Sequence, residues 1–369
     1  MCSSDLSRRY YIGLMSGTSL DGVDAALADL SSKSVQVLAG VHVPFEPRLR
    51  AELLALNAPG QDEIHRAALL GNELARCYAA AVDAALVRAA VSAREVIAIG
   101  CHGQTVRHRP ALGYTVQIGN PALLAELSGI CVVADFRHRD VAAGGQGAPL
   151  VPAFHAFAFA SPDEDRVVIN LGGIANLTWL PRSGAVTGFD CGPGNCLLDL
   201  WAARHLGMPM DANGDWAAGG TVDQGLLERF LAEPYLSASP PKSTGRDLFN
   251  ADWLSEHGAD EIDPRAAQAT LLEFSAQCVS DACRRHYPGV QRLIVCGGGL
   301  RNAALMQRLA ELCSPVPVVS SETLGAAPEL VEAVAFAWLA RMALEGLPAS
   351  VPAVTGAKGP RVLGAIYPR

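Results

Sequence analysis

Two glycine-containing turns, each set between apolar strands, constrain the fold of this chain more than any other feature of its sequence. The first lies within residues 13–24 (GLMSGTSLDGVD) and the second within residues 170–176 (NLGGIAN). Each follows a short apolar run and leads into another, which predicts a hairpin tip in both places. Glycine tolerates positive φ and carries no Cβ, so backbone N–H groups at such a tip can approach phosphate oxygens closely. For either turn alone, an ordinary tight turn is the commoner interpretation.

The first turn is less ordinary, because hydroxyls and carboxylates crowd around its glycines. They belong to Ser16, Thr18, Ser19, Asp21 and Asp24. Hard cations take oxygen ligands and often bind through water. The mixture is therefore suited to phosphate groups and to a metal ion that accompanies them.

Length and composition favour a two-domain, cytoplasmic protein. The chain has 369 residues, half of them apolar, and a single hydrophobic core stops growing at about 250–300 residues. We therefore expect two packed domains with a cleft between them. Ten cysteines without a C-x-x-C pair favour free thiols in a reducing compartment. The first apolar stretch is too short for a signal peptide, and no run reaches the ~18–20 apolar residues that span a bilayer, so no membrane is expected.

The charge of the chain argues against nucleic acid as a partner. Its formal net charge is −8, from 37 acidic and 29 basic residues, and it contains no run of lysine or arginine. A protein that binds nucleic acid needs a basic footprint for the phosphate backbone. We therefore exclude that partner.

The order of predicted elements indicates a duplicated architecture. In each half a meander of three strands precedes helices and further strands. In the first half the expected elements are strands 10–15, 23–30, 35–42, 96–100, 114–118 and 131–134, with helices 64–90 and 121–128. In the second half they are strands 166–171, 175–180, 186–190, 292–296 and 316–320, with helices 195–205, 302–312 and 328–344.

The glycine-rich and charged loop 137–149 is the expected junction between the domains. This gives domains at residues 1–139 and 140–369, with the C-terminal segment as a candidate to pack back on the first domain. A long solvent loop is the alternative, although structureless loops of this length are uncommon unless they are functional. Residues 208–243 are predicted to be a loop-rich insertion that holds one helix, 223–232.

Asp190 is predicted to end a strand, and a helix is predicted to open at Asn195. A carboxylate at a strand end, beside the N–H groups of a helix N-terminus, can deprotonate a substrate oxygen where developing charge is stabilised. The alternative is an Asp that only caps the helix. Asp199, one turn into that helix, is either a partner of this group or a surface acid.

Other polar groups follow apolar strands. Gly297, Gly298 and Gly299 offer a flat backbone against which a base or ribose can pack, but they lack the last glycine of the dinucleotide fingerprint, and the chain has no P-loop. Arg137 could hold a carboxylate, whereas Glu332 in a first helical turn is also favoured simply by the helix dipole. Candidates to bind a polar substrate, or to serve only as turn residues, are His102, Gln104, Thr105 and Arg107.

Together these motifs closely resemble those of the anhydro-N-acetylmuramic acid kinases, members of the superfamily of actin, sugar kinases and Hsp70-type chaperones. Cys101 and Cys191 depart from the pattern, since a small hydroxyl residue is expected at both positions. The resemblance implies an α/β, two-domain, actin-like (ribonuclease H-like) ATPase fold with an interdomain cleft. The matching segments are 13–24, 101–105, 135–137 with 140–150, 170–176, 189–190 with 192–195, and 296–299.

The resemblance implies a phosphotransferase that converts 1,6-anhydro-N-acetylmuramic acid and ATP to N-acetylmuramic acid 6-phosphate and ADP, a step in cell-wall sugar recycling. In an anhydro sugar O6 is an ether oxygen without a proton, so a water must attack C1 while O6 attacks the γ-phosphate. Asp190 is then the base for that water. The alternatives are an ordinary sugar kinase acting on a free hydroxyl and a non-catalytic actin-like or chaperone-type ATPase.

The same resemblance assigns the binding residues. Asp21 and Asp24 are candidate Mg²⁺ ligands through water, Gly297 to Gly299 would face the adenosine, and a small amino sugar is the expected partner, bound by a homodimer. The residues expected to bind ATP are Gly17, Thr18, Ser19, Leu20, Asp21, Gly22, Val23, Asp24, Gly172, Gly173, Gly297, Gly298 and Gly299. The residues expected to contact the sugar are Gln104, Thr105, Arg137 and Glu332.

Overall fold

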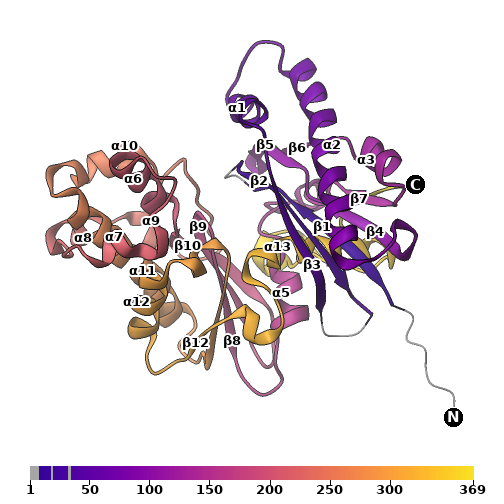
Figure 1. Ribbon diagram of the computed structural model, residues 1–369. Coiled ribbons are helices and arrows are strands. Elements are labelled where there is room, and N and C mark those ends of the chain that lie inside the picture. The colour runs from indigo at the N-terminus through magenta and orange to yellow at the C-terminus, as the bar shows by residue number, and fades with distance from the viewer. Residues whose placement is uncertain (1–7, 18–19, 32–34) are drawn as a thin grey trace. The chain divides into compact units, whose positions relative to one another are not determined.

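The computed structural model describes residues 8–17, 20–31 and 35–369 (Figure 1). By its internal packing the chain divides into two compact units. Unit 1 comprises Met1–Ala158 and Gly325–Arg369, and unit 2 comprises Phe159–Leu324. The first boundary thus lies beyond the junction expected after residue 139, and the segment from Gly325 packs with unit 1.

Unit 1 is built on a six-stranded sheet with the strand order β13-β7-β4-β1-β2-β3. The first three strands form an antiparallel meander, β4 runs parallel to β1, and β7 runs parallel to β4. β1 is apolar and buried along almost its whole length, as expected for a strand covered on both faces. The strands are β1 (Tyr10–Met15), β2 (Gly22–Asp29), β3 (Gln36–Pro44), β4 (Val96–Cys101), β7 (Val132–Ala134) and β13 (Ala365–Tyr367).

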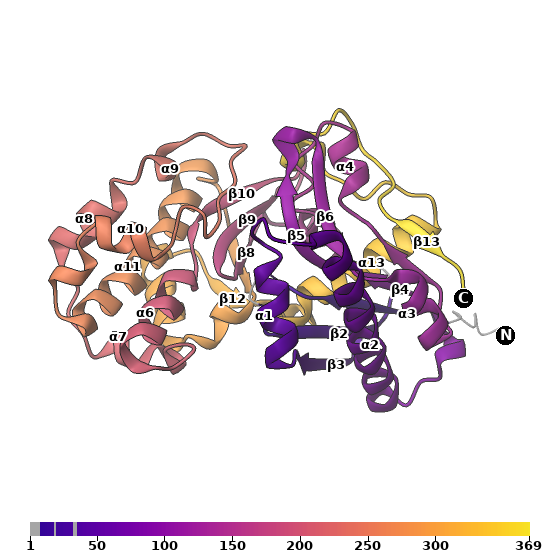
Figure 2. The same cartoon turned by 90° about the horizontal axis from the view of Figure 1, so that it is seen from above.

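Two helices cover this sheet. α2 (Glu63–Ala89) packs on β2 and β3, beside which it lies in Figure 2, and α13 (Val331–Leu344) packs on β1 and β4. A Cβ on Gly13 would lie 1.7 Å from the Ala333 carbonyl oxygen, and one on Gly100 would lie 1.9 Å from that of Phe336. Glycine at both positions therefore lets α13 approach the strands closely, and this contact fixes the first turn of the helix, which carries Glu332.

The remaining elements of unit 1 include part of the predicted junction loop. Within residues 137–149 the chain forms α4, and Asp140 is fully buried. Asp140 Oδ2 accepts the Gly147 N–H at 2.8 Å, and Asp140 Oδ1 accepts the Thr355 hydroxyl at 2.9 Å. These contacts exclude a solvent loop here. The other elements are α1 (Pro47–Ala55), β5 (Gln104–Arg109), β6 (Tyr114–Ile118), α3 (Pro121–Ser128), α4 (His138–Ala142), α5 (Val151–Phe159) and α14 (Pro352–Thr355).

Unit 2 repeats the plan with a five-stranded sheet in the order β10-β9-β8-β11-β12. Its first three strands again form an antiparallel meander, and β11 and β12 continue parallel to β8. The duplicated α/β architecture and the predicted fold class are therefore confirmed. The strands are β8 (Arg166–Leu171), β9 (Ile174–Leu180), β10 (Thr187–Pro193), β11 (Arg292–Cys296) and β12 (Val318–Ser320).

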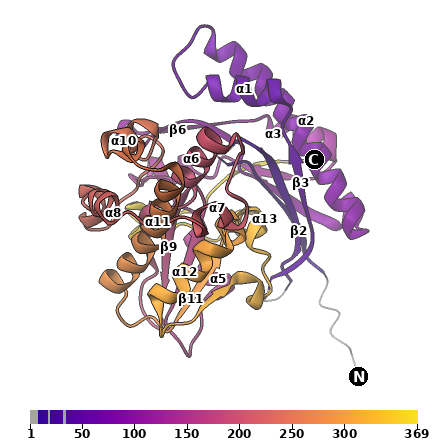
Figure 3. The ribbon, with the colours of Figure 1, turned by 60° about the vertical axis from the view of Figure 1, so that its left-hand side comes forward.

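Helices gather beside the sheet of unit 2 (Figure 3). The longest, α11, was not among the predicted elements. The segment 208–243 holds the predicted helix as α8, together with the short helices α7 and α9. The helices are α6 (Cys196–Leu206), α7 (Asp215–Ala218), α8 (Gln224–Leu231), α9 (Pro234–Ser237), α10 (Ala251–Glu256), α11 (Pro264–His286) and α12 (Ala303–Cys313).

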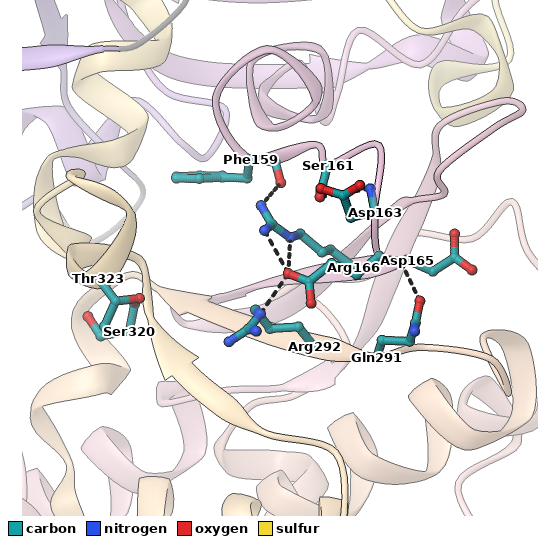
Figure 4. A network of polar contacts seen from close by, with 10 residues as sticks. Phe159, Ser161, Asp163, Asp165, Arg166, Gln291, Arg292, Ser320 and Thr323 are labelled. Carbon is teal, nitrogen blue, oxygen red and sulfur yellow. Dashed lines mark hydrogen bonds and ion pairs between the residues drawn. The ribbon is translucent and has the colours of Figure 1, made fainter.

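Ion pairs fix the starting ends of β8 and β11 (Figure 4). The Glu164 carboxylate accepts hydrogen bonds from Arg166 and Arg292, each at 2.7 Å, and these two arginines are paired in the sheet register. Arg166 also donates to the Phe159 carbonyl at 2.7 Å. Because the two strands start together and run parallel, their far ends lie side by side, and those ends lead into the glycine turns.

Candidate functional site

The Gly172–Gly173 turn joins β8 to β9, as predicted, and the start of α6 holds it in place. The N–H groups of Gly194 and Cys196 donate to the Gly173 carbonyl at 2.9 and 3.0 Å, and that of Asn195 donates to the Gly172 carbonyl at 2.9 Å. In a planar trans peptide the N–H points opposite to the carbonyl, so the Gly173 N–H is aimed away from α6. The helix-start donors, expected to stabilise charge beside Asp190, are instead used by the turn.

The glycines of unit 2 fall into two groups. A Cβ on Gly172 or Gly173 would meet nothing closer than 3.4 Å, and one on Gly298 would meet nothing within 4 Å. A Cβ on Gly297, which has φ +88°, would lie 2.4 Å from Asn170 Oδ1, and one on Gly299 would lie 2.7 Å from Leu171 Cβ. Packing thus requires glycine at 297 and 299. Packing does not require glycine at 172, 173 and 298, which together are called the cradle.

A polar row crosses the sheet just below this turn. Asn170 on β8 pairs with Asn176 on β9, and Asn176 pairs with Asp190 on β10. On the other side Asn170 pairs with Cys296, at the end of β11. Residues paired in register point to the same face of a sheet, so the two amides and the carboxylate face one side. Asn170 and Asn176 were not predicted as site residues. Their positions on either side of the two glycines in the sequence could have indicated them.

Asp190 does not end its strand, as the sequence had suggested. β10 continues through a bulge between Asp190 and Gly192 and ends at Pro193, and α6 begins only at Cys196. The prediction failed because Gly192, with φ +156°, bends the strand without ending it. The bulge leaves the Asp190 side chain half-buried on the polar row.

The environment of Asp190 is suited to a general base. Its carboxylate Oδ2 accepts the Thr244 N–H at 3.1 Å. Burial raises the pKa of Asp190 to about 6, and the Thr244 N–H acts in the opposite direction. A base whose pKa lies near the working pH is mostly deprotonated and yet accepts a proton readily. Asp199 is also partly buried, and burial raises its pKa to about 6 as well.

The segment from Tyr235 to Lys242 makes hydrogen bonds with the backbone of Asp190. The Tyr235 hydroxyl donates to the Asp190 carbonyl at 2.7 Å, and the Asp190 N–H donates to the Lys242 carbonyl at 3.3 Å. The Lys242 ammonium lies 4.7 Å from the Tyr235 ring centroid and 5.5 Å from that of Phe189, and it donates to the carbonyls of Tyr235 and Leu236 at 3.0 and 3.1 Å. These cation–π and hydrogen-bond contacts fix the segment against β10.

The first glycine turn, in unit 1, joins β1 to β2 as predicted. The buried Ser16 hydroxyl lies 2.8 Å from the Tyr78 hydroxyl and 3.1 Å from the Gly103 carbonyl, to which it donates. The Gln104 amide donates to the Gly17 carbonyl at 3.2 Å, and Leu20 has φ +54°. Thr18 and Ser19, both predicted to bind ATP, lie outside the described residues.

The packing of unit 1 also constrains residues that the sequence assigned to the ATP site. A Cβ on Gly22 would lie 2.3 Å from the Val43 carbonyl, so the pairing of β2 with β3 requires glycine there. Val23 is fully buried in the core. Asp21 is exposed, and the half-buried Asp24 has its Oδ1 2.9 Å from His42 Nδ1. Within the described ranges no three His, Cys, Asp or Glu side chains form a metal-binding group.

Three polar side chains of unit 1 come together. Arg137 donates from Nε and Nη2 to His102 Nε2 at 3.1 and 2.9 Å, and from Nη1 to the Gly147 carbonyl at 2.7 Å. Burial, aided by Arg137, lowers the pKa of His102 to about 3, so the ring is a neutral acceptor. Burial raises the pKa of Glu332, and the charge of Arg137 opposes this. Burial lowers the pKa of Arg137 only to about 10, so it stays charged.

Gln104 and Thr105 lie on the neighbouring hairpin. Gln104 is 1% exposed, and its Oε1 is a buried acceptor with no partner among the residues that the structure describes. The Thr105 hydroxyl accepts from Gln117 at 3.1 Å. Arg107, in contrast, pairs with Glu63 at 2.8 Å, which gives it a structural role.

Comparison with known proteins places the chain in a family. A family model described as anhydro-N-acetylmuramic acid kinase matches residues 9–369. Proteins named anhydro-N-acetylmuramic acid kinase are 56% identical in Cupriavidus pinatubonensis, where the match covers 97% of this chain and 98% of the relative, and 57% identical in Bordetella petrii, where it covers 98% and 96%.

Solved structures of more distant proteins are also similar. The activator of the 2-hydroxyisocaproyl-CoA dehydratase from Clostridium difficile, with bound ADPNP, is 14% identical with a TM-score of 0.45, covering 89% of this chain and 92% of that one. A ROK family glucokinase from Streptomyces griseus is 15% identical with a TM-score of 0.42, covering 90% and 99%. The family match and the near relatives together show that this chain belongs to the anhydro-N-acetylmuramic acid kinase family.

Proposed function

We propose that this protein uses ATP and water to open the ring of 1,6-anhydro-N-acetylmuramic acid and to phosphorylate O6, giving N-acetylmuramic acid 6-phosphate and ADP. Relatives at 51–57% identity over nearly the whole chain carry the name of this kinase. The observation that carries the proposal is Asp190, a half-buried carboxylate of raised pKa on the polar row beside the Gly172–Gly173 turn.

The chemistry assigns Asp190 to water rather than to the sugar. O6 of the anhydro sugar is an ether oxygen and has no proton to give. Asp190 accepts a proton from a water as the water oxygen bonds to C1, and the bond from C1 to O6 breaks. O6 keeps that electron pair and attacks the γ-phosphorus, and ADP leaves. One carboxylate of suitable pKa is enough for this sequence.

ATP is proposed to bind along the cradle of unit 2, with phosphates at Gly172 and Gly173 and the adenosine against Gly298. The family motif assigns the phosphates to residues 17–24 of unit 1 in the same way. Mg²⁺ bound to the phosphates would neutralise their charge. Asp21 and Asp24 would hold it through water, which fits side chains that are exposed or half-buried.

The amino sugar is proposed to contact Arg137, Glu332, Gln104 and Thr105. Arg137 is a charged donor fixed by His102 and Gly147. The unpartnered Oε1 of Gln104 is an acceptor that a hydroxyl or amide N–H of the sugar would satisfy. We further propose a cytoplasmic homodimer. Light scattering of the purified protein tests the dimer, and cell fractionation tests the location.

Reaction in ¹⁸O-labelled water tests the function. Mass spectrometry should find one label at C1 of the phosphorylated product, because only ring opening by water places it there. An ordinary sugar kinase would phosphorylate a free hydroxyl and leave the product unlabelled. Asp190→Asn should retain binding of both substrates and lose turnover by about 10²–10⁴-fold. Unlabelled product, or near-normal turnover of Asp190→Asn, would contradict the proposal.

In the described part of the chain no helix is long and apolar enough to cross a bilayer. The cysteines there are all free thiols, and burial raises the pKa of Cys101 to about 12 and that of Cys196 to about 11. Thiols held protonated in this way are poor nucleophiles, so no covalent role is assigned to them.

A further inference from the structure

We propose that Arg246 binds the phosphoryl group that is transferred, at the Gly172–Gly173 turn. This inference rests on the proposed function, since it takes that turn as the phosphate site.

The Arg246 guanidinium lies beside the turn and the first turn of α6. A Cβ on Gly173 would be 3.9 Å from Arg246 Nη2. The charge of Arg246 also opposes the effect of burial on the pKa values of Cys196 and Asp199, which are the first and fourth residues of α6. The guanidinium thus lies near Gly173, and its charge is felt by two residues in the first turn of α6.

The Arg246 guanidinium is not used by contacts within the described part of the protein. Its side chain is exposed, and it makes no hydrogen bond or ion pair with any residue that the structure describes. Asp199 is close enough to be felt electrostatically but forms no ion pair with it within the described ranges. The guanidinium donors are therefore available to a phosphate at the turn, whereas the N–H groups at the start of α6 already donate to Gly172 and Gly173.

The order of strands identifies which phosphate is involved. Across the sheet the row runs from Cys296, which precedes Gly298, through Asn170 and Asn176 to Asp190. The adenosine is proposed at the Gly298 side, so we place the terminal phosphate toward Asp190, the proposed base. Arg246 comes from that same side.

The chain around Thr244 strengthens this assignment. The Thr244 N–H donates to the Asp190 carboxylate at 3.1 Å, and Arg246 follows two residues later. One short segment therefore contacts the proposed base and carries the guanidinium to the glycine turn. Asp190 would act on the water that attacks C1, and Arg246 would bind the phosphoryl group that O6 receives.

The guanidinium would take no part in proton transfer. It would donate hydrogen bonds to oxygens of the γ-phosphoryl group while the bond from O6 to phosphorus forms and the bond from phosphorus to the bridging oxygen of ADP breaks. Guanidinium donors match the geometry of phosphate oxygens, whereas a lysine provides only a point charge. The γ-phosphate is absent from ADP, so the contact should distinguish the two nucleotides.

Calorimetric binding of a non-hydrolysable ATP analogue and of ADP, both with Mg²⁺, tests the inference. Arg246→Gln should weaken binding of the analogue by about 10- to 100-fold, the loss expected for hydrogen bonds to a charged group, and should change ADP binding by less than about 3-fold. The affinity of Arg246→Lys for the analogue should lie between those of the wild type and Arg246→Gln. Lysine keeps the positive charge but lacks the paired N–H donors of a guanidinium. Arg284→Gln is the matched control, since Arg284 is exposed on α11 and pairs only with Asp281 one turn earlier.

An unchanged ratio of analogue to ADP affinity in Arg246→Gln overturns the inference, and so does an equal loss of both nucleotides, because the contact would then not be to the γ-phosphate. The sugar assignment is tested separately by the product that the wild-type protein forms. If the wild type leaves the anhydro sugar unchanged while Arg246→Gln still loses the analogue selectively, the proposed substrate is wrong and the role of Arg246 stands.

Discussion

Replacement of Asp190 by asparagine should make the protein more stable above neutral pH while it lowers turnover by about 10²–10⁴-fold. In the folded protein the pKa of Asp190 is raised from its ordinary value of 3.8 to about 6 by burial. Protonation therefore favours the folded state. This stabilisation is fully present below about pH 3.8 and is lost as the pH rises through about 6.

The magnitude follows from the difference between the two pKa values. At about 1.4 kcal/mol for each pKa unit, a carboxylate charged above pH 7 costs about 3 kcal/mol relative to its protonated form. Asparagine has nearly the same shape, carries no charge and can accept the Thr244 N–H through its Oδ1. At pH 8 the free energy of unfolding of Asp190→Asn should exceed that of the wild type by up to about 3 kcal/mol, and near pH 4 the two should agree within about 0.5 kcal/mol.

Urea unfolding followed by tryptophan fluorescence is a direct assay, because four of the five tryptophans, at positions 179, 201, 216 and 253, belong to unit 2. The exposed Asp163→Asn is the control and should change stability by no more than about 0.5 kcal/mol at either pH. The pH dependence of kcat/KM should fall on the acid side, to about half at pH 6 and about a tenth at pH 5. A variant Asp190→Asn that is no more stable than the wild type at pH 8 would refute the reasoning.

Three further outcomes follow from the contacts. His102→Leu removes the acceptor that holds Arg137 and should raise KM for the sugar about tenfold without changing KM for ATP, and His102→Gln, which restores an acceptor, should recover most of the loss. Gly297→Ala should lower the free energy of unfolding by about 2 kcal/mol or more, because its Cβ would meet Asn170 Oδ1 at 2.4 Å, whereas Gly298→Ala should unfold like the wild type but bind ATP more weakly in a titration. Gly13→Ala should lower Tm by about 5 °C or more, since its Cβ would lie 1.7 Å from the Ala333 carbonyl.

Local patterns in the sequence predicted the sheets well, because each strand carries its own evidence. The apolar runs before and after both glycine turns predicted the two meanders, and the structure confirms them. The interior of unit 2 was harder. α11 buries polar side chains, among them Ser275, whose hydroxyl donates to the Gly194 carbonyl at 2.9 Å, and Glu273, which pairs with Arg308. Buried polar residues that have partners inside the protein interrupt the apolar periodicity by which a helix is predicted. For α11, only Asp263 and Pro264 at its N-terminus indicated a helix.

The groups that set the chemistry of Asp190 could not be predicted from any local pattern. Tyr235 and Thr244 reach it from 45 and 54 residues further along the chain. They belong to a segment that resembles an ordinary loop, because its order depends on Lys242 packing between two aromatic rings. Such contacts arise only when the fold brings distant segments together. The sequence indicated the Asp190 carboxylate as a candidate base, but it could not predict the raised pKa of that carboxylate.

Glycine residues show this limit of sequence-based prediction most clearly. The sequence shows where a glycine lies, but not whether packing requires glycine at that position. Gly22 and Gly297 both lie in motifs that suggest phosphate or adenosine, and each is required by a neighbouring backbone or side chain, at 2.3 and 2.4 Å from the missing Cβ. At Gly173 and Gly298 the same test finds only ordinary contact or open space. At Gly173 the turn carbonyls are held by α6, and a Cβ would meet no close neighbour, so packing leaves room for a ligand there. That difference between the two kinds of glycine supports the proposal that the nucleotide binds to unit 2 at Gly173 and Gly298.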